Sequence, residues 1–443
     1  MKPTSPPTIS GWGRVPVAGR ELRSEDLERL TEDAVLCRGL ARSYGDASLP
    51  PPGRPVVVAS PLADRILSFD RGTGVMRAEA GLSLRELNRL LLARGWFIPV
   101  SPGTQYVTMG GMVAADVHGK NHHQDGCFGE HVRALRMRVA DGRILECSRE
   151  RERDLFRATL GGMGLTGHIL EVEFELVRVP SPWIWGESQR IDALDQFLDA
   201  LKASAPSWPY SVGWIDCLSR GSHMGRGILM CGRFATRDEA PAAPPCWKRR
   251  LTLPVVLPEW ALSRTGVRLF NALYYWRHAA RVKRGIVHPE TFFYPLDVVL
   301  EWNRMYGPRG FTQYQAVIPE AGGKPAVRRF FDLLTRQGGA SFLCVIKDFA
   351  GEGTGVLSFP KRGTSIAMDI AVRDDTQGLV DALNALVIAE GGRVYLAKDG
   401  FTRAADYRQM EPRLAEFERI RRQWDPGHRV RSAMSVRLLG DQP

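Results

Sequence analysis

The sequence predicts an α+β fold of two domains, and three observations lead to this. The chain has 443 residues, more than one hydrophobic core usually serves. Its apolar content of 44% and charged content of 25% are those of a globular protein. Strand and helix patterns follow one another without a regular βαβ alternation, and a Trp- and Pro-bearing stretch at 177–187 indicates a boundary between domains.

The part before this boundary contains short elements with clear local signals. Residues 34–39 read as a buried strand that runs into a loop. Residues 83–95 predict a helix, with Ser83 and Glu86 as a capping box and Gly95 as the C-cap. Residues 132–148 predict a hairpin turned at Asp141-Gly142. Residues 170–176 alternate apolar residues with glutamates, which is typical of a strand with one buried and one solvent-exposed face.

The part after the boundary has longer strand patterns. Strands are predicted within 310–319, 340–349 and 365–372, with a helix over 326–339 between them. A sheet backed by helices is the natural arrangement. Residues 235–290 are predicted to be irregular, because they are rich in Pro early and in Arg, Trp and Tyr later. The chain returns to helix at 412–426.

The charge and the cysteines limit where the protein acts. Its formal charge of +11 and pI of about 9.5 favour an anionic partner, such as nucleic acid, an acidic membrane surface or a phosphorylated substrate. The seven scattered cysteines contain no CxxC pair and indicate free thiols in a reducing compartment. No apolar run approaches the length of a membrane span. We expect a cytoplasmic protein, with contact to the inner face of the plasma membrane open to it.

The stretch DVHGKNHHQDG, residues 116–126, raises the question of a metal site. His118 and His122 stand at positions i and i+4, but a catalytic zinc site on a helix favours HExxH. Here Gly119 weakens a helix, and the ammonium group of Lys120 would repel a cation. The residues therefore predict no metal, and a polar loop with incidental histidines is the simplest interpretation.

Three glycine-rich loops point to a dinucleotide. Residues 38–46, 101–121 and 160–167 offer bare backbone N–H groups and small side chains, which suit a pyrophosphate. The last loop contains GxGxxG, but it follows a helix pattern and leads into a strand. A Rossmann site needs the reverse order, so we expect a dinucleotide that is held in another way.

These loops also carry a resemblance to a known family. The blocks GLARSYGD, PGTQYVTMGGMVAADVHGKNHH, LGGMGLTGHI, EWNRMYGPRGFTQYQ and GGRVYLAKD resemble the vanillyl-alcohol-oxidase/PCMH-type FAD-binding oxidases. The similarity runs in order from about residue 34 to the C-terminus. The HGKNHH and YxAKD blocks are similar to the branch that oxidises a polyprenyl-phosphoryl ribose.

The resemblance implies an FAD-binding domain over 1–180, completed by 393–443, and a substrate-binding domain over 181–392, built as an antiparallel sheet backed by helices. Covalent family members have a histidine where this chain has Arg42, so the FAD is expected to be non-covalent. The residues expected to bind it are Arg42, Ser43, Tyr44, Gly45, Gly103, Thr104, Thr108, Gly110, Gly111, His118, Gly119, Asn121, Tyr395 and Lys398.

The resemblance also implies roles at the flavin. Lys398 would place positive charge near flavin N1/O2, and either His118 or Lys398 would take the hydroxyl proton. The substrate-side residues are expected to be Lys120, Tyr294, Arg304, Gln313, Gln315 and Lys347. Ser365 and Ala367 stand where the most similar branch has an Asn-x-Cys pair, so the FAD site is expected to persist while the exact substrate stays open.

The implied activity is oxidation of the ribose 2-hydroxyl to a 2-keto sugar, which an NAD(P)H-dependent short-chain reductase partner would convert to the arabinose epimer. A soluble sugar-lactone or alditol oxidase on the same scaffold is the alternative. A flavin-binding protein without turnover is also open.

A different class of function, nucleic-acid binding, is suggested by the charge and by the aromatic and basic residues of 274–285. The charge is dispersed and no binding motif is present, so we expect no nucleic acid. The basic and aromatic segment 247–285 instead predicts weak, salt-sensitive contact with acidic membranes, with a solvated loop as the alternative.

Overall fold

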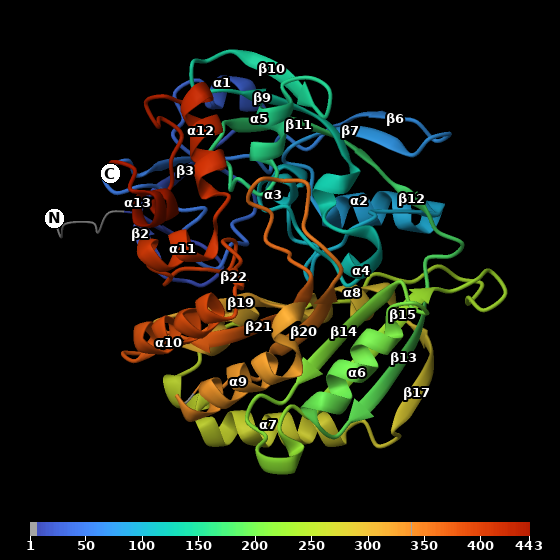
Figure 1. Cartoon of the computed structure of the whole chain (residues 1–443). Helices are drawn as coiled ribbons and strands as arrows, with labels where there is room; N and C mark the ends of the chain where they lie inside the picture. Colours follow the sequence, from blue (N-terminus) through green and yellow to red (C-terminus); the bar gives the residue numbers. More distant parts are fainter. Residues whose placement is uncertain (1–6, 338) are drawn as a thin grey trace.

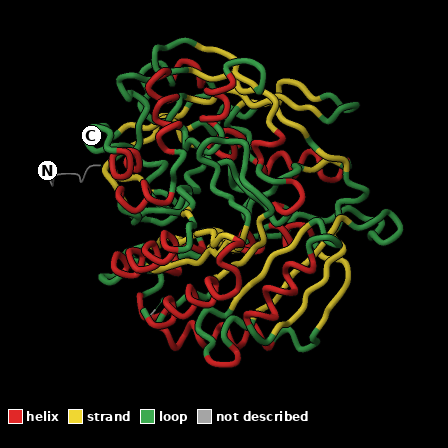
Figure 2. Tube along the Cα trace, viewed as in Figure 1, coloured by secondary structure: helices red, strands yellow, loops and turns green. Residues whose placement is uncertain are grey.

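The computed structural model describes residues 7–337 and 339–443, and its fold is α+β with two domains, as predicted. One domain lies in the upper half of Figure 1 and the other, with the largest sheet, in the lower half. Loops and turns, green in Figure 2, fill much of the region between them. The site described below lies where the two domains meet.

The upper domain contains a five-stranded antiparallel sheet and a small parallel one. The order of the large sheet is β10-β9-β11-β7-β6, and that of the parallel sheet is β3-β5-β4. Its strands are β1 (Thr8–Ser10), β2 (Pro16–Ala18), β3 (Arg20–Arg23), β4 (Cys37–Arg38), β5 (Val56–Ala59), β6 (Ile66–Phe69), β7 (Val75–Glu79), β8 (Trp96–Phe97), β9 (Val132–Arg138), β10 (Ile144–Ser148), β11 (His168–Glu175) and β12 (Val177–Arg178). Its helices are α1 (Leu27–Leu30), α2 (Leu84–Leu91), α3 (Met109–Ala114), α4 (His122–Asp125) and α5 (Arg153–Thr159).

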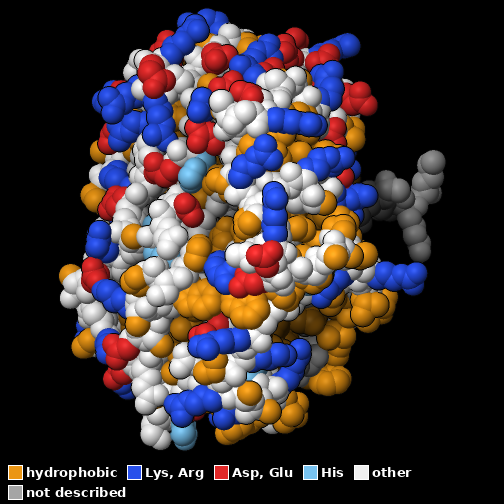
Figure 3. Space-filling view, turned by 90° about the vertical axis from the view of Figure 1, so that its right-hand side faces the viewer, with side chains coloured by type: hydrophobic (Ala, Val, Ile, Leu, Met, Phe, Trp, Pro, Cys, Tyr) orange, Lys and Arg blue, Asp and Glu red, His pale blue; other side chains and the backbone are white. Residues whose placement is uncertain are grey.

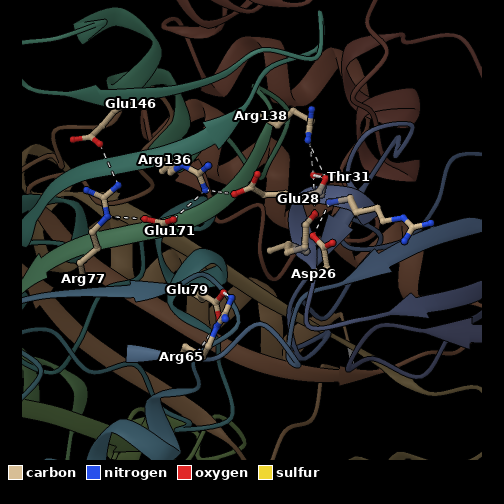
Figure 4. Close-up of polar contacts among 12 residues, drawn as sticks. Asp26, Glu28, Thr31, Arg65, Arg77, Glu79, Arg136, Arg138, Glu146 and Glu171 are labelled. Carbon is tan, nitrogen blue, oxygen red and sulfur yellow. Dashed lines mark hydrogen bonds and ion pairs between the residues drawn. The ribbon is translucent and has the colours of Figure 1, made fainter. Parts of the chain in front are cut away.

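Ion pairs tie the strands of the five-stranded sheet together across its polar face (Figure 4). The Arg77 guanidinium lies 2.6 Å from Glu171 on β11 and 3.1 Å from Glu146 on β10. Arg136 on β9 lies 3.0 Å from the same Glu171 and also pairs with Glu28 of α1. The alternation of charged and apolar residues along these strands thus gives a paired outer face and a buried inner one.

The C-terminal part of the chain returns to the upper domain. It forms α11 (Ala404–Met410), α12 (Leu414–Trp424) and α13 (Ala433–Leu439), and α12 lies beside α5 in Figure 1. Arg157 of α5 and Glu416 of α12 pair at 3.3 Å. Arg421 is fully buried and pairs with Asp441 at 2.6 Å, which fixes α12 to the end of the chain. Helices α11, α12 and α13 therefore belong with the upper domain, whereas residues 393–394 form the edge strand of the lower sheet. The domain boundaries stay a prediction.

The lower domain is built on an eight-stranded sheet of order β17-β13-β15-β14-β20-β21-β19-β22, antiparallel throughout. Its strands are β13 (Ile184–Ile191), β14 (Tyr210–Ile215), β15 (Gly227–Phe234), β17 (Val282–Val287), β19 (Phe311–Pro319), β20 (Cys344–Phe349), β21 (Gly363–Ala371) and β22 (Arg393–Val394), with the short pair β16 (Leu251–Thr252) and β18 (Val299–Leu300) beside it. The helices are α6 (Leu194–Ser204), α7 (Arg264–Trp276), α8 (Pro289–Phe293), α9 (Gly323–Arg336) and α10 (Thr376–Ala389).

The two faces of this sheet are covered by different helices. A side chain at Gly213 of β14 would meet Phe197 of α6. The neighbouring Trp214 points to the other face, where it packs on Tyr274 of α7 with ring centroids 4.6 Å apart. Helices α6, α9 and α10 therefore back one face of the sheet and α7 lies on the other.

The prediction that residues 235–290 are irregular was wrong for their second half. That half forms the 13-residue helix α7 and the edge strand β17. Helix α7 has apolar residues on both sides, with Val267 and Tyr275 buried and Leu269 and Leu273 exposed. Its sequence therefore lacks the single apolar stripe that usually predicts a helix.

Candidate active site

The histidine-rich stretch 116–126 is held by both domains. Asp116 has a positive φ of 38° and is buried. Its carboxylate accepts a hydrogen bond from the Gly129 N–H at 2.8 Å and another from the Ser358 hydroxyl, which belongs to the loop between β20 and β21. His118, two residues on, forms an isolated antiparallel bridge with Cys127. These contacts fix the loop and direct His118 toward the lower domain.

His118 is a buried, neutral imidazole with a polar partner at each nitrogen. Its Nε2 lies 3.0 Å from the Gln315 carboxamide nitrogen, and its Nδ1 lies 3.4 Å from Lys347 Nζ. Burial, followed by the positive charge of Lys347, holds the pKa of His118 well below its usual range. The Gln315 carboxamide nitrogen can only donate, so Nε2 accepts this hydrogen bond and the proton of the neutral imidazole is on Nδ1, which faces Lys347.

Three half-buried lysines converge on this region. Burial lowers the pKa of Lys347 to about 8. Burial and the charge of Lys347 lower the pKa of Lys120 to about 7. Burial also lowers the pKa of Lys398 to about 7, although Asp369 opposes the shift. Lys120 donates to the Phe293 carbonyl at 3.0 Å, and Lys398 lies over the Tyr44 ring, 3.9 Å from its centroid. Such a group of desolvated amines favours an anionic ligand.

A buried carboxylate lies behind Lys398. Asp369 on β21 accepts a hydrogen bond from the Tyr306 hydroxyl at 2.6 Å and one from the Gln313 carboxamide at 2.5 Å. Burial raises its pKa to about 6, against the lowering effect of both hydrogen bonds and of Lys398. The predicted substrate residue Gln313 is thus engaged by Asp369. Gln315, two residues further along β19 on the same face, contacts His118 instead.

Three glycines of the predicted cofactor loops, Gly45, Gly110 and Gly119, sit where a side chain would meet a neighbouring segment. A side chain at Gly45 would lie 1.7 Å from the Asp399 carbonyl oxygen, which joins the RSYG loop to the C-terminal segment. One at Gly110 would lie 2.9 Å from Ala80, and one at Gly119 would lie 2.4 Å from Asn121. Thr108 caps α3 by accepting from the Gly111 N–H at 3.2 Å. Gly103, by contrast, faces open space.

The remaining cofactor-side residues surround the same region. Tyr44 N–H donates to the Ala397 carbonyl at 3.0 Å, and the Ser43 carbonyl accepts from Trp12 at 2.8 Å. The Tyr395 hydroxyl donates to the Ala115 carbonyl at 2.8 Å. The Thr104 hydroxyl donates to Asp297 of the lower domain at 2.7 Å. The loops from three separate parts of the chain are therefore tied to one another at the junction of the two domains.

These residues fit an FAD. Several buried polar atoms on the cofactor loops have no hydrogen-bond partner among the described residues: Arg42 Nε, Gln105 Oε1, Asn121 Oδ1 and both ring nitrogens of His122. The Arg42 Nε–H is a donor and suits a phosphate oxygen. The Gln105 and Asn121 oxygens are acceptors and suit hydroxyl or ring N–H groups. Arg42 also stacks on Trp12, 3.8 Å from its centroid, which holds the guanidinium in a fixed plane.

Two predicted substrate residues have their polar groups engaged by other parts of the protein. Arg304 donates to the Leu253 and Pro254 carbonyls at 2.9 and 3.1 Å, so its guanidinium holds the 251–260 segment. The Tyr294 hydroxyl is buried and bonded to Asn88 at 2.9 Å and Ser101 at 2.6 Å. Their contact with substrate stays a prediction.

Some residues of the site were not predicted from the sequence. Asp369 is one, and its signal was a carboxylate in an otherwise apolar strand pattern, which demands a buried partner. Phe349 and Phe359 are others, with ring centroids 4.9 and 5.8 Å from that of His118. Ser365, noted as a departure from the family pattern, lies 3.1 Å from the Gln315 carboxamide. Aromatic residues of this kind give no signal that separates them from core.

The chain was compared with known proteins. The profile of a family described as FAD binding domain matches residues 29–148. A decaprenylphosphoryl-beta-D-ribose oxidase of Mycolicibacterium smegmatis is 34% identical, over 98% of this chain and 98% of its own length. An uncharacterized protein in the mprA 5′ region of Streptomyces coelicolor is 31% identical over 81% of this chain and 100% of its own. A putative D-arabinono-1,4-lactone oxidase of Neurospora crassa is 33% identical, over only 26% of this chain and 20% of its own.

Proposed function

This chain belongs to the family of the decaprenylphosphoryl-β-D-ribose oxidases and is an FAD-dependent oxidoreductase, and from that premise we propose that it oxidises the 2-hydroxyl of a polyprenyl-phosphoryl ribose to the 2-keto sugar. This would be the first half of an epimerisation to arabinose. The observation that carries the proposal is the buried cluster of His118, Gln315 and Lys347 beside Lys398, in a chain that matches the ribose oxidase over nearly its whole length.

The reaction removes a proton from the hydroxyl and a hydride from the carbon that bears it. FAD, when bound, supplies the acceptor for the hydride. We propose His118 and Lys398 as the two candidates for the base that accepts the hydroxyl proton. Each has a pKa low enough for an unprotonated form near neutral pH. A protonated Lys398 would stabilise negative charge that develops during the reaction. Phe349 and Phe359 exclude water from the His118 ring.

The anionic part of the substrate is proposed to contact lysines. Lys347 and Lys120 are half-buried and form no ion pair in the part of the chain that the structure describes, so a phosphodiester would supply the missing negative charge. Gln315 and Gln313 are proposed to orient sugar hydroxyls. Ser365 and Ala367 have small side chains and are proposed to form part of the pocket wall. Their size would leave room in the pocket and so affect which sugar fits.

The test is anaerobic mixing of the FAD-loaded protein with a short-chain polyprenyl-phosphoryl ribose, followed by the loss of flavin absorbance. Free ribose, an alditol and a sugar lactone serve as separate comparisons. Bleaching by the phospholipid sugar alone supports the proposal. Bleaching by a lactone or alditol alone would favour the soluble-oxidase alternative, whose relative matches only a quarter of this chain.

The product of this reaction defines a partner. A 2-keto sugar must be reduced to yield the arabinose epimer, and we propose an NAD(P)H-dependent short-chain reductase for that step. A lipid-linked substrate would bring the protein to a membrane surface, and we propose that this is the cytoplasmic side. Formation of the arabinose product only when both proteins are present would support the partnership, whereas its formation by this chain alone would refute it.

A further inference from the structure

We propose that helix α7 and the segment before it form a membrane-contact surface, whose apolar side chains enter an acidic lipid bilayer beside the site of oxidation. This surface, called here the α7 surface, consists of Leu251, Val255, Val256, Trp260, Leu269, Phe270, Leu273 and Trp276, all exposed. The inference deepens the proposed function, since it assigns a place on the fold where a lipid-linked substrate is delivered.

The outward face of α7 is apolar by its own geometry. Leu269 is 62% exposed, Leu273 64% and Trp276 58%. Their spacing of four and three residues places them on one side of the helix. The opposite side is fixed in the fold, because Asn271 is buried and donates to Asp216 at 2.9 Å, and Tyr275 is buried against Trp214. The helix therefore presents this stripe outward without exposing a core face.

The segment before α7 extends the apolar area. Leu251 is 72% exposed and Trp260 is 75% exposed. The Arg304 guanidinium holds the backbone here through the Leu253 and Pro254 carbonyls. In the view of Figure 3, hydrophobic side chains gather at the lower right, in the half of the molecule formed by the substrate-binding domain. An apolar area of this kind on an isolated chain marks a contact surface.

Charge selects an acidic bilayer as the occupant. Residues 247–285 contain nine Lys and Arg and one acidic residue, Glu259, which pairs with Arg309 at 3.1 Å. Some of these cations are engaged, since Arg250 pairs with Glu290 and Arg284 with Glu187. Others in the same segment are exposed, namely Arg249, Arg268, Arg277 and Lys283. Tryptophan and free basic residues around leucines are the composition of an interfacial membrane contact.

The helix would lie on the bilayer and not through it. Among residues 7–337 and 339–443, no helix is long and apolar enough to span a membrane. Helix α7 has 13 residues and one of its sides is packed on the sheet. Insertion is therefore limited to the outward side chains, to the depth of the headgroup and acyl boundary.

The α7 surface is connected to the site by one face of the sheet. Trp214 pairs in register with Val345, Val345 with Ala367, and Lys347 with Ser365. Residues paired across strands, and residues two apart along one strand, project to the same face. Trp214, which packs on Tyr274 of α7, therefore lies on the same sheet face as Lys347, Ser365 and Gln315. Lys347 on β20 and Trp214 on the neighbouring β14 are one strand and two residues apart, roughly 8 Å, so a polyprenyl tail that leaves Lys347 along this face reaches the residue that packs on α7.

The test uses the FAD-loaded full chain and vesicle flotation, with phosphatidylcholine vesicles that contain or lack phosphatidylglycerol. The variant Leu269→Glu/Leu273→Glu alters two exposed side chains, so its FAD content and melting temperature should equal those of the wild type. The control Leu67→Glu/Leu90→Glu introduces the same charges at exposed leucines of β6 and α2. We expect the α7 variant to bind anionic vesicles about 100-fold more weakly, and the control to bind like the wild type.

The catalytic readout separates this inference from the proposed function. A water-soluble short-chain substrate should bleach the flavin of the α7 variant at the wild-type rate, whereas a long-chain substrate in vesicles should bleach it far more slowly. The α7 variant could lose flotation while neither substrate bleaches the flavin of the variant or of the wild type. That result would support the α7 surface and refute the proposed substrate. Equal flotation of variant and wild type, or a dimer in solution that the α7 substitutions dissociate in place of vesicle binding, would overturn the inference.

Discussion

Replacing Lys398 with methionine is predicted to raise the stability of the FAD-free protein while it slows flavin reduction. A lysine has a pKa of 10.5 in an unfolded chain, and burial lowers that of Lys398 to about 7. In the window between these values the unfolded state binds the extra proton, so this group makes the folded state more stable as pH rises from about 7 to about 10. Below pH 7 the full desolvation cost, up to about 5 kcal/mol, opposes folding.

Methionine keeps the length of the side chain and removes this cost. The Asp369 carboxyl loses its cationic neighbour in exchange, so a net gain of roughly 1–3 kcal/mol at pH 6.5 is expected. The reaction should behave in the opposite way. Loss of a preorganised positive charge beside the reacting centre should slow flavin reduction about 100- to 1000-fold, with FAD binding changed much less.

The assays are urea unfolding of the FAD-free protein at pH 6.5 and pH 9, and stopped-flow reduction of the FAD-loaded protein. Lys202→Met is the matched control, because Lys202 is exposed and pairs with Glu320 on the surface. A variant that is destabilised at pH 6.5 as much as at pH 9 would refute the account of a desolvated ammonium. Reduction at the wild-type rate in a folded, FAD-replete variant would remove Lys398 from the proposed role.

The other predictions concern the cofactor, the proton acceptor and the backbone of the site. Acid or heat should release all the flavin, because Arg42 stands where covalent family members have a histidine; colour that stays with the precipitated chain would contradict this. His118→Ala should lower the rate of flavin reduction at least about 100-fold at neutral pH, and a change of less than about twofold at every pH would leave Lys398 as the base. Gly45→Ala should lower the yield of folded, FAD-loaded protein, because its Cβ would lie 1.7 Å from the Asp399 carbonyl oxygen; wild-type FAD content and melting temperature would show that the two segments can separate freely.

Elements with strong local signals were predictable from the sequence. The predicted helix over 83–95 is confirmed as α2 with a short 3₁₀ turn after it, with the Ser83 side chain accepting from the Glu86 N–H and Gly95 in the left-handed region at φ 79°. The hairpin turned at Asp141-Gly142 is confirmed as β9 and β10. In both cases the residues that decide the conformation lie within a few positions of each other, so the pattern contains the needed information.

Features that depend on distant parts of the chain were harder to predict. His118 meets Gln315 and Lys347, which lie about 200 residues further on, and only the family resemblance placed them together. The buried position of Asp369 depends on Tyr306 and Gln313, which come from other elements. Helix α7 was missed because its outward apolar residues hide the helical period, and these same residues form the α7 surface. Its contact with lipid would supply the burial that the isolated fold lacks.

The most direct test of the central claim is the rate of anaerobic flavin bleaching by polyprenyl-phosphoryl ribose that carries deuterium at C2. Oxidation of the 2-hydroxyl breaks the C2–H bond, so the account predicts slower bleaching with the C2-deuterated substrate and an unchanged rate with deuterium at C3. Equal rates for the C2-deuterated and unlabelled substrates, together with slower bleaching when C3 is labelled, would show that another hydroxyl is oxidised and would contradict the account.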